Sequence, residues 1–497
     1  MTSKLPDLLI HHILSFVKVK QAVQTCILSK RWRYIWTSLP FLNFDISDLP
    51  QQSYRCNYHL DRLVDNVLSL RDNRCFDMRR FHLIGGYAAF KSISHLRRWI
   101  IGVARSNVED IYVQFYGSYN NNDREFRVLD CVFTCNLLTK LELDLSTSCK
   151  IILPNFISLP RLRYLKLNNP SFDYDALTKL CNNCPLLEHL DLSGIRNSEP
   201  LNINISSHTL KHLSLGVANS SAPLNITISS LSLKHFEVHI GYHSSIHNTL
   251  RLCAPNLVYL VLSNLDYMLL EDVSSLVRAD VGVQLKPRKL NAKFWRIHAQ
   301  DTLKSLKSLR NVKDLTISLR PLKDVRRVQE LLQEQPFEFS NLQRLKLQNI
   351  SPSKDSMHAI ASLVKISPII ESIKLELCQD VETNYSYNHN YNYNHSDTDA
   401  EQEMESDPHT GEPTVDLEGL LADTMKQLKS VEISGLQGSD NELEFIQILM
   451  KNAMVLKKMV LRTQLYRSRI EKFCEEEENF PSASSSLRIC FHLLQNF

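Results

Sequence analysis

The sequence predicts an α/β fold in which a solenoid of repeating strand–helix units follows a short helical module. Two observations predict it: an L-x-x-L-x-L motif recurs along the 497 residues, and three apolar clusters at helical spacing precede the regular copies. The chain has only 12 glycines, which argues against a turn-dense β-sandwich and against glycine-rich phosphate loops. A leucine repeat with so little glycine indicates stacked strand–helix units.

The repeated motif occurs in a regular and a looser form. The regular copies start about 23–25 residues apart: LTKLEL from Leu138, LRYLKL from Leu162, LEHLDL from Leu187, LKHLSL from Leu210, LKHFEV from Leu233 and LVYLVL from Leu257. The looser copies, at about 28–30 residues where they are adjacent, are VKDLTI from Val312, LQRLKL from Leu342, IESIKL from Ile370, LKSVEI from Leu428 and LKKMVL from Leu456. A degenerate early copy, VEDIYV, starts at Val108. Chance occurrence in a leucine-rich chain does not explain so many copies at roughly regular spacing.

The end of each motif alternates apolar and polar residues, which is the period of a half-buried strand. One such strand cannot bury its own leucines, so we expect the units to stack into a parallel sheet with a continuous leucine core. Helix-like stretches lie between motifs, for example residues 173–187 and 324–335. This period is that of a leucine-rich-repeat solenoid, with parallel strands on the concave face and helices outside.

The first 45 residues lie outside the repeat and predict three short helices. The stretch LPDLLIHHILSFV places Leu9, Ile13 and Phe16 on one helical stripe with Ile10, Leu14 and Val17 beside it. Two further apolar clusters follow: Ala22, Val23, Cys26 and Ile27, then Trp32, Ile35 and Trp36. A core of about 40 residues is marginal by itself. We therefore expect the module to complete its burial on another protein or, alternatively, to cap the first repeat.

The stretch LSKRWRYIW mixes cations with aromatic rings and is open to three interpretations: a nucleic-acid patch, a membrane-surface helix or a protein-docking helix. The net charge of +3 predicts no global basic field for nucleic acid or anionic lipid. No apolar run approaches the ~18 residues that span a bilayer. We therefore expect neither a nucleic-acid nor a membrane partner, and we expect Lys30, Arg31 and Arg33 to form a solvated rim.

The N-terminal module resembles the F-box of plant F-box/leucine-rich-repeat proteins. The motif stands at Leu5-Pro6-Asp7, Ile13-Leu14-Ser15-Phe16, Leu28-Ser29-Lys30-Arg31-Trp32-Arg33, Trp36 and Leu39–Asp45. Leu8 departs from it, because an acidic residue is common at that position. The resemblance implies docking to a Skp-type adaptor and through it to a cullin. The adaptor-binding residues that it implies are Leu5, Pro6, Leu9, Ile13, Leu14, Leu28 and Trp32, some of which are expected to be core instead.

A second resemblance covers the C-terminal part. Residues 428–461 are similar to the FBD region of many of these plant proteins, with matching positions at Gly435, Gly438, Glu442, Glu444, Phe445, Leu449, Asn452, Ala453, Leu456 and Met459. The Trp/Pro/Cys stretch that often precedes this region is missing. The expected domains are an F-box at 1–45, a linker and N-terminal cap at 46–105, leucine-rich repeats at 106–379, a loop at 380–415 and an FBD-like region at 416–497 that continues the solenoid.

The expected loop is rich in Asn, Tyr and His and then acidic, so it cannot bury enough apolar surface to order itself. Cys181 and Cys184 form an isolated CxxC, with no second pair or His pair to complete a zinc site. The four-residue spacing of His235, His239, His243 and His247 is interrupted by Gly241, so we interpret it as accidental. We expect no metal and no cofactor.

Two functional hypotheses remain. No HExxH, GxGxxG after a strand or GxSxG motif is present, so an enzyme has little support. The family resemblance implies a substrate-recognition subunit of a Skp–cullin–F-box ubiquitin ligase in the cytoplasm or nucleus, with an unknown target protein. The alternative is a binding scaffold whose F-box is non-degradative or does not dock. Target binding is expected on exposed middle positions of the strands, which are Glu142, Lys166, Asp191, Ser214, Glu237 and Lys346.

Overall fold

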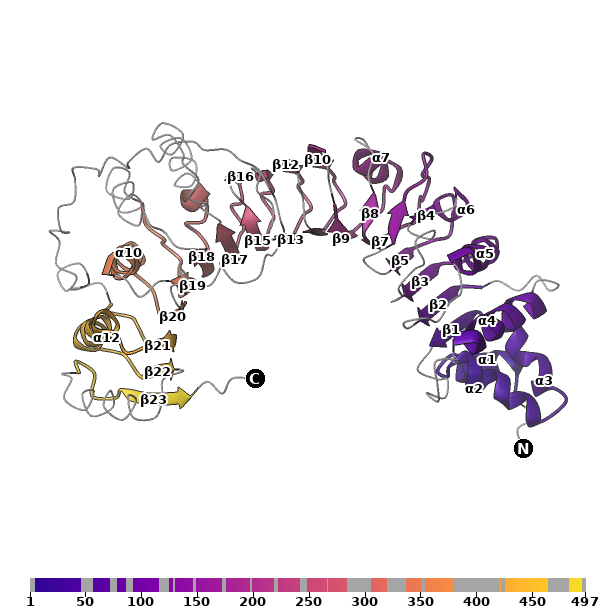
Figure 1. Cartoon of the computed structure of the whole chain (residues 1–497), viewed down its shortest axis with the longest axis horizontal. Coiled ribbons are helices and arrows are strands. Elements are labelled where there is room, and N and C mark those ends of the chain that lie inside the picture. The colour runs from indigo at the N-terminus through magenta and orange to yellow at the C-terminus, as the bar shows by residue number, and fades with distance from the viewer. Residues whose placement is uncertain are drawn as a thin grey trace, which may run out of the picture. The chain divides into compact units, whose positions relative to one another are not determined.

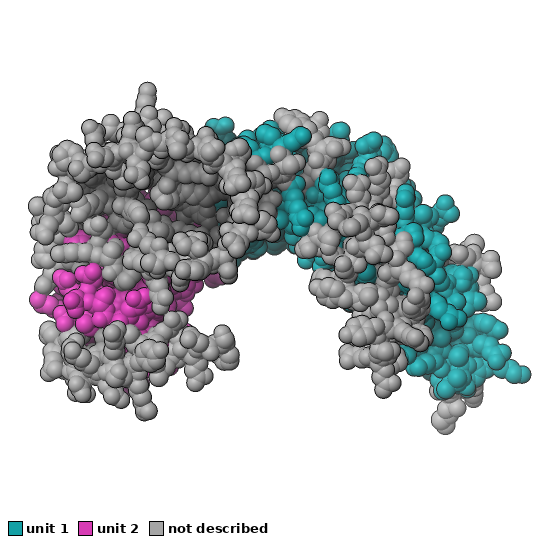
Figure 2. Space-filling view, in the orientation of Figure 1, with its two compact units in different colours: residues 1–276 teal, residues 277–497 magenta. Residues whose placement is uncertain are grey.

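The computed structural model divides into two compact units, residues 1–276 and residues 277–497 (Figures 1 and 2). The structure describes residues 5–45, 57–71, 78–85, 93–115, 125–127, 130–145, 149–171, 176–196, 199–218, 222–241, 248–265, 267–283, 305–319, 337–350, 354–378, 421, 425–463 and 482–493. The predicted loop at 380–415 and the predicted helix at 324–335 lie outside the described residues. Each unit is described by itself below.

Unit 1 begins with the helical module that the sequence predicts. Its elements are α1 (Asp7–Leu14), α2 (Val19–Gln24), η2 (Thr25–Ile27), α3 (Trp32–Ile35) and η3 (Trp36–Ser38). Pro6 precedes α1 with φ −57°, the value that its ring imposes and that a helix start accepts. Strand β1 (Phe41–Asp45) follows directly and pairs in parallel with β2 (Arg80–Gly85), so the tail of the module is the first strand of the sheet.

The main sheet of unit 1 is parallel and runs in the order β1-β2-β3-β5-β7-β9-β11-β13-β15. Its further strands are β3 (Asp110–Phe115), β5 (Lys140–Leu145), β7 (Tyr164–Asn168), β9 (His189–Ile195), β11 (His212–Val217), β13 (His235–Ile240) and β15 (Tyr259–Leu265). In this main sheet, every strand after β2 starts within one of the predicted motif copies, which confirms the predicted series of parallel strands.

Leucines stack in register through this sheet. In the second position of five neighbouring strands, Leu165, Leu190, Leu213, Phe236 and Leu260 lie side by side and are buried. The alternation of buried and partly exposed residues along each strand places these side chains in the core and leaves the intervening residues on the opposite face, the strand face. Each fully buried leucine contributes about 1.5–3 kcal/mol through loss of water contact.

A second layer covers the core on the side opposite to the strand face (Figure 1). Its helices are α4 (Asn57–Arg71), α5 (Ile93–Ala104), α6 (Asp130–Phe133) and α7 (Ala176–Asn183), which is the predicted placement of helices outside the sheet. Two small parallel sheets complete the layer: β4 (Glu125–Arg127), β6 (Lys150–Ile152) and β8 (Pro170–Ser171), then β10 (Leu201–Ser206), β12 (Leu224–Ser229), β14 (Asn248–Cys253) and β16 (Tyr267–Asp272).

Strands replace helices in the second layer where the repeat is shortest. In β12, Leu224, Ile226 and Ile228 are buried while the residues between them are exposed, which is a strand period rather than a helix period. A strand also rises about 3.3 Å per residue against 1.5 Å for a helix, so it crosses a repeat with fewer residues. Repeats of about 23 residues therefore accommodate a strand in place of the expected helix.

Unit 2 repeats the same plan. Its strands, parallel in the order given, are β17 (Arg278–Val283), β18 (Asp314–Leu319), β19 (Arg344–Ile350), β20 (Ser372–Leu377), β21 (Ser430–Leu436), β22 (Lys458–Thr463) and β23 (Arg488–Leu493). Helices α10 (Lys354–Lys365) and α12 (Asp440–Asn452) connect strands. The looser motif copies thus form strands as predicted, and β17 and β23 add strands that the motif did not reveal.

The turn between β21 and α12 explains the pattern of residues 435–442. Gly435 and Gly438 have φ of +84° and +76°, a region that side chains with a Cβ rarely adopt. The buried Glu442 carboxylate accepts hydrogen bonds from the backbone N–H groups of Gly438 and Ser439 at 2.7 and 2.9 Å, and from Gln437 at 3.1 Å. The carboxylate thereby satisfies the N–H group of Ser439, the N-cap of α12, and those of the two turn residues before it.

Candidate adaptor-docking face of the helical module

The core of the helical module is closed by residues from all three helices. The buried side chains are Ile10 and Leu14 of α1, Val19 and Ala22 of α2, Trp32 and Ile35 of α3, and Trp36 of η3. Leu14 and Trp32 are therefore core residues, although both are among the predicted adaptor-binding residues. Both tryptophans face inward: the Trp36 Nε1 donates to the Arg33 carbonyl at 2.9 Å, and the Trp32 Nε1 has no hydrogen-bond partner among the residues that the structure describes.

The remaining predicted docking residues lie at the surface. Leu9, Ile13 and Leu28 are 50%, 49% and 60% exposed, Pro6 is exposed and Leu5 is partly exposed. Leu9 and Ile13 are four residues apart on α1 and share its outer stripe, while Ile10 and Leu14 face the core. Helix α1 is thus apolar on both sides, with one side buried in the core of the module and the other exposed.

Further apolar side chains enlarge this surface beyond the predicted set. They are Leu8, Phe16 and Val17 around α1, Ile27 at the end of η2 and Tyr34 on α3. We call these residues, together with Pro6, Leu9, Ile13 and Leu28, the docking face. Phe16 stood in the predicted stripe, whereas Leu8 stood out only as a departure from the family motif. Large exposed apolar patches of this kind mark interaction sites on soluble proteins.

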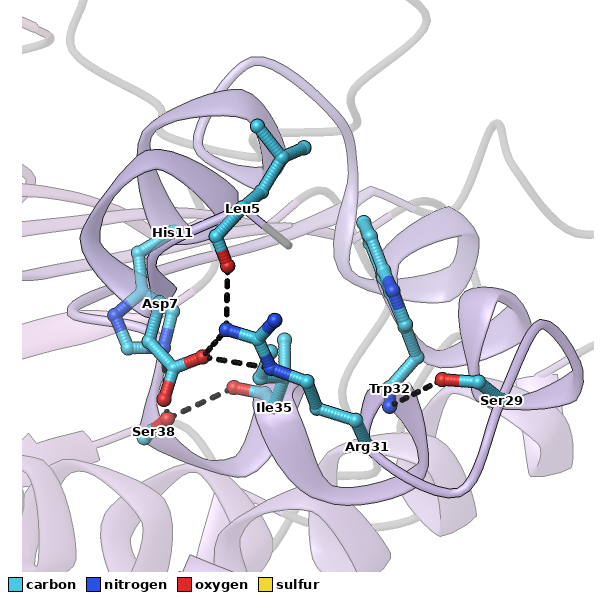
Figure 3. Close-up of polar contacts among 8 residues, drawn as sticks. All are labelled: Leu5, Asp7, His11, Ser29, Arg31, Trp32, Ile35 and Ser38. Atoms are coloured by element: carbon cyan, nitrogen blue, oxygen red, sulfur yellow. Dashed lines mark hydrogen bonds and ion pairs between the residues drawn. The ribbon is translucent and has the colours of Figure 1, made fainter. Parts of the chain in front are cut away.

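Arg31 ties the two parts of the docking face together (Figure 3). Its guanidinium donates to the Leu5 carbonyl at 2.5 Å and to the Asp7 carboxylate at 3.1 Å from Nε. These bonds hold the start of α1 against the segment that follows Leu28. Arg31 stays partly exposed, so it lies at the rim as expected, but its bonds to Leu5 and Asp7 add a structural role that the sequence did not predict. Lys30 and Arg33 are exposed as expected.

Two more polar contacts hold the module together, one from α1 and one from Lys18, which precedes α2. His11 Nε2 lies 2.8 Å from Ser38 Oγ, which itself donates to the Ile35 carbonyl at 2.9 Å (Figure 3). Lys18 pairs with Asp45 of β1 at 3.0 Å. Polar contacts therefore fix α1 from its inner side, and no polar residue is needed on its apolar outer stripe. The arrangement presents a preorganised apolar surface for binding rather than a reactive group.

The strand face carries the other predicted site residues. Glu142, Lys166, Asp191, Ser214 and Glu237 lie in register on neighbouring strands of unit 1, as predicted for the middle position of each motif. Lys166 and Asp191 form an ion pair at 3.5 Å. Lys346 belongs to unit 2, where it pairs with Glu376 at 2.8 Å.

The CxxC pair and the histidine series, which the sequence analysis did not assign to a metal site, lie partly within the described residues. Burial raises the pKa of the Cys181 thiol to about 11 and that of Cys184 to about 12, with the neighbouring thiol as a second cause for Cys184. Both are therefore protonated thiols at neutral pH. His235 and His239 lie on β13, and residues 243 and 247 fall outside the described part. No cluster of three or more potential metal ligands occurs among the residues described.

A helical module at the head of a leucine-rich parallel sheet defines an F-box/leucine-rich-repeat protein, and the comparisons agree. Residues 2–44 match the F-box domain family. Residues 96–288 match the leucine-rich repeats of the FBD-associated F-box protein At5g56370, and residues 425–461 match the FBD family. The three matches together support a plant F-box/leucine-rich-repeat protein with a C-terminal FBD region.

Similar proteins are found in Arabidopsis thaliana. The F-box/FBD/LRR-repeat protein At1g78750 is 30% identical over 195 residues, which are 38% of this chain and 41% of the relative. The putative F-box/LRR-repeat protein At5g41840 is 26% identical over 389 residues, or 75% of this chain and 68% of the relative. The chain thus spans less than half of the first relative's length. Among the described helices, none has the length and apolar character needed to cross a membrane.

Proposed function

We propose that this chain is the substrate-recognition subunit of a Skp–cullin–F-box ubiquitin ligase. The docking face binds a Skp-type adaptor and through it a cullin, while the leucine-rich repeats hold a target protein. The observation that carries the proposal is the docking face itself: Leu9, Ile13 and Leu28 are 50%, 49% and 60% exposed on a module whose core is already closed. Apolar side chains in that position gain free energy only by binding a partner.

The proposed mechanism is tethering. A target bound by the repeats is kept near the ubiquitin-charged enzyme, which raises the effective concentration of its lysines. The chain supplies binding surfaces, and none of its side chains needs to react. The proposed division of labour among the predicted residues follows from burial: Pro6, Leu9, Ile13 and Leu28 contact the adaptor, and Leu14 and Trp32 support them from the core.

Co-purification with a Skp-type adaptor tests the proposal. The variant Leu9→Ala/Ile13→Ala/Leu28→Ala removes exposed side chains, so it is expected to fold normally and to bind the adaptor at least about a hundredfold more weakly, since interface hot spots contribute about 2 kcal/mol or more each. Phe156→Ala is the matched control, because Phe156 is another exposed apolar residue of unit 1 outside the module. Its adaptor affinity is expected to equal that of the unaltered chain.

Two results would count against the proposal. Adaptor binding that survives the triple substitution would remove the docking face from the adaptor interface. Normal adaptor binding without ubiquitin transfer to any captured protein, in a reconstituted ligase, would instead favour the scaffold function. Thermal unfolding of each variant shows whether lost binding comes from the interface or from a damaged fold.

A further inference from the structure

Five rings form a row on the strand face of unit 1. Tyr164, His189, His212, His235 and Tyr259 occupy matched first positions of β7, β9, β11, β13 and β15. The first two imidazoles stack with centroids 4.1 Å apart and planes 7° apart, and the next two with 4.3 Å and 11°. The tyrosine rings end the row at 5.7 and 6.0 Å. We call this row the ring ladder.

The ring ladder presents the edges of its imidazoles rather than their faces. Because the three imidazoles stack on one another, the faces of the central ring are covered, and the ring nitrogens lie at the edges. Within the described residues, no hydrogen bond is made by the three imidazoles and all three are partly exposed, but the Nδ1 atom of His235 is buried, so only the other edge of that ring faces solvent. Single-stranded nucleic acid needs open ring faces for its bases. The ladder instead offers unpaired ring nitrogens at about the spacing of the strands.

A row of cations lies directly beside the ladder. Arg163, Glu188, Lys211 and Lys234 immediately precede the ladder residues and are neighbours, since backbone hydrogen bonds of 2.8–2.9 Å join each to the next. Glu188 pairs with Arg163 and, at 2.9 Å, with Lys211. Lys234 is exposed and has no carboxylate partner in the described part of the chain. These four residues, the basic edge, thus carry three cations against one carboxylate.

The opposite side of the ladder carries no excess of cations. There Lys166 pairs with Asp191 at 3.5 Å, Ser214 is neutral, and Glu237 lies 3.8 Å from His239, which is a cation only when it is protonated. The excess of positive charge next to the ladder therefore lies on the basic edge. A ligand that spans both rows meets imidazole edges on one side and lysines on the other, a combination that complements carboxylates.

We propose that the ring ladder and the basic edge bind an extended acidic peptide segment of the target protein. Its carboxylates accept hydrogen bonds from the imidazole edges and form ion pairs with Lys211 and Lys234. The proposal rests on the proposed function, in which the repeats hold the target, and it names the surface and the chemistry of that target. The peptide lies across strands β7 to β15, so several carboxylates engage at once.

Proton uptake should accompany this binding. In the free chain the pKa of His212 is lowered to about 4 by burial, by His189 and His235, and by Lys211 and Lys234. Carboxylates of the peptide oppose the repulsion from the two lysines and therefore raise that pKa. By linkage, a ligand that favours the protonated imidazole binds more tightly as the pH falls.

The test uses the full chain and a fluorescently labelled oligoglutamate peptide. Affinity is expected to increase about tenfold as the pH falls from about 8 to about 6, and to decrease with salt. Calorimetry in two buffers of different ionisation enthalpy measures proton uptake, which His212→Gln should reduce. Lys234→Gln should weaken binding several-fold. Lys179→Gln, an exposed lysine on α7 of the same unit, is the matched control and should change nothing.

Several outcomes would overturn the inference: no binding of oligoglutamate, no proton uptake, or equal effects of Lys234→Gln and Lys179→Gln. Tighter binding of oligothymidylate than of oligoglutamate would assign the surface to nucleic acid instead. Adaptor binding is measured on the same preparations. If the unaltered chain binds the adaptor but not the peptide, the proposal for the ring ladder fails and the proposed function stands. If the unaltered chain does not bind the adaptor, the proposed function itself fails.

Discussion

The helical module and the strand face treat apolar residues in opposite ways. In the module, α1 buries Ile10 and Leu14 and exposes Leu9 and Ile13. In the sheet, every second residue of β11 is buried, and the face that remains carries imidazoles, hydroxyls and charges. Both regions are rich in leucine, yet α1 exposes a leucine on its outer stripe whereas the strand face of β11 exposes none.

The difference comes from geometry. Stacked strands enclose their apolar side against a second layer along the whole sheet, so the repeats need no partner to complete their core. Three short helices cannot surround one another fully, and part of their apolar surface stays in contact with water. An apolar substitution in the module therefore affects binding or stability according to which side of α1 or α3 it removes, whereas in the repeats it affects stability.

The largest expected effect comes from comparing a substitution in the core of the module with one on its exposed side. Trp32→Ala removes a buried ring and should cost about 3–5 kcal/mol, enough to unfold a module with so small a core. Leu28→Ala should weaken adaptor binding while leaving the module folded, because Leu28 is exposed. Limited proteolysis of residues 5–45 beside an adaptor-binding measurement separates the two. Equal protease resistance of both variants would contradict the core assignment of Trp32.

A smaller effect is expected from neighbours in the repeat. Leu215 of β11 is fully buried, and Leu215→Ala should lower the free energy of unfolding by about 2–5 kcal/mol. Ser214 precedes it on the strand face, and Ser214→Ala should stay within about 0.5 kcal/mol of the unaltered chain. Chemical denaturation measures both. Similar losses in the two variants would mean that the strand face also contributes to the core.

The repeat was predictable from the sequence because its signal is local. Each L-x-x-L-x-L copy contains the alternation of a strand and fixes which residues of that strand are buried. Each copy therefore predicts one strand. Before β2, Met78 replaces the leading leucine of the motif, so residues 80–85 do not match it. Before β1, Leu39 keeps that position, but residues 39–45 also match the F-box, and the F-box resemblance hid the strand. The outer strands β10 and β12 do alternate, in LNINIS and LNITIS, but the expectation of helices hid that signal. The domain boundaries at residues 45 and 105 stay predictions.

The candidate sites were less predictable because they depend on contacts between distant residues. Which side of α1 is core depends on where α3 packs, and Arg31 meets Asp7 across 24 residues. The ring ladder had a signal, since His189, His212 and His235 recur at the repeat period in LEH, LKH and LKH. The four-residue spacing that starts at His235 was the more obvious pattern. The neighbouring rings of His235, however, lie one repeat away along the chain, not four residues away.

The smallest expected effect concerns the ring ladder and pH. Burial, two flanking imidazoles and Lys211 and Lys234 lower the pKa of His212 from 6.5 to about 4 in the folded chain. Between these two values the unfolded chain holds a proton on this imidazole that the folded chain lacks, so the stability contributed by its neutral form is present above about pH 6.5 and is lost as the pH falls. Burial also lowers the pKa of His189, which adds to the same trend.

His212→Gln removes this titration and keeps a side chain of similar length on the strand face. Denaturation of the unaltered chain should show the free energy of unfolding falling as the pH moves from about 7 to about 5, and the variant should fall less over the same range. His208→Gln is the control, because His208 is exposed in the turn before β11 and lies outside the ladder. If His208→Gln and His212→Gln change the pH dependence equally, stacking does not set the charge state of the central imidazole. The strand face would then be an ordinary solvated surface, and its contrast with the docking face would rest on polarity alone.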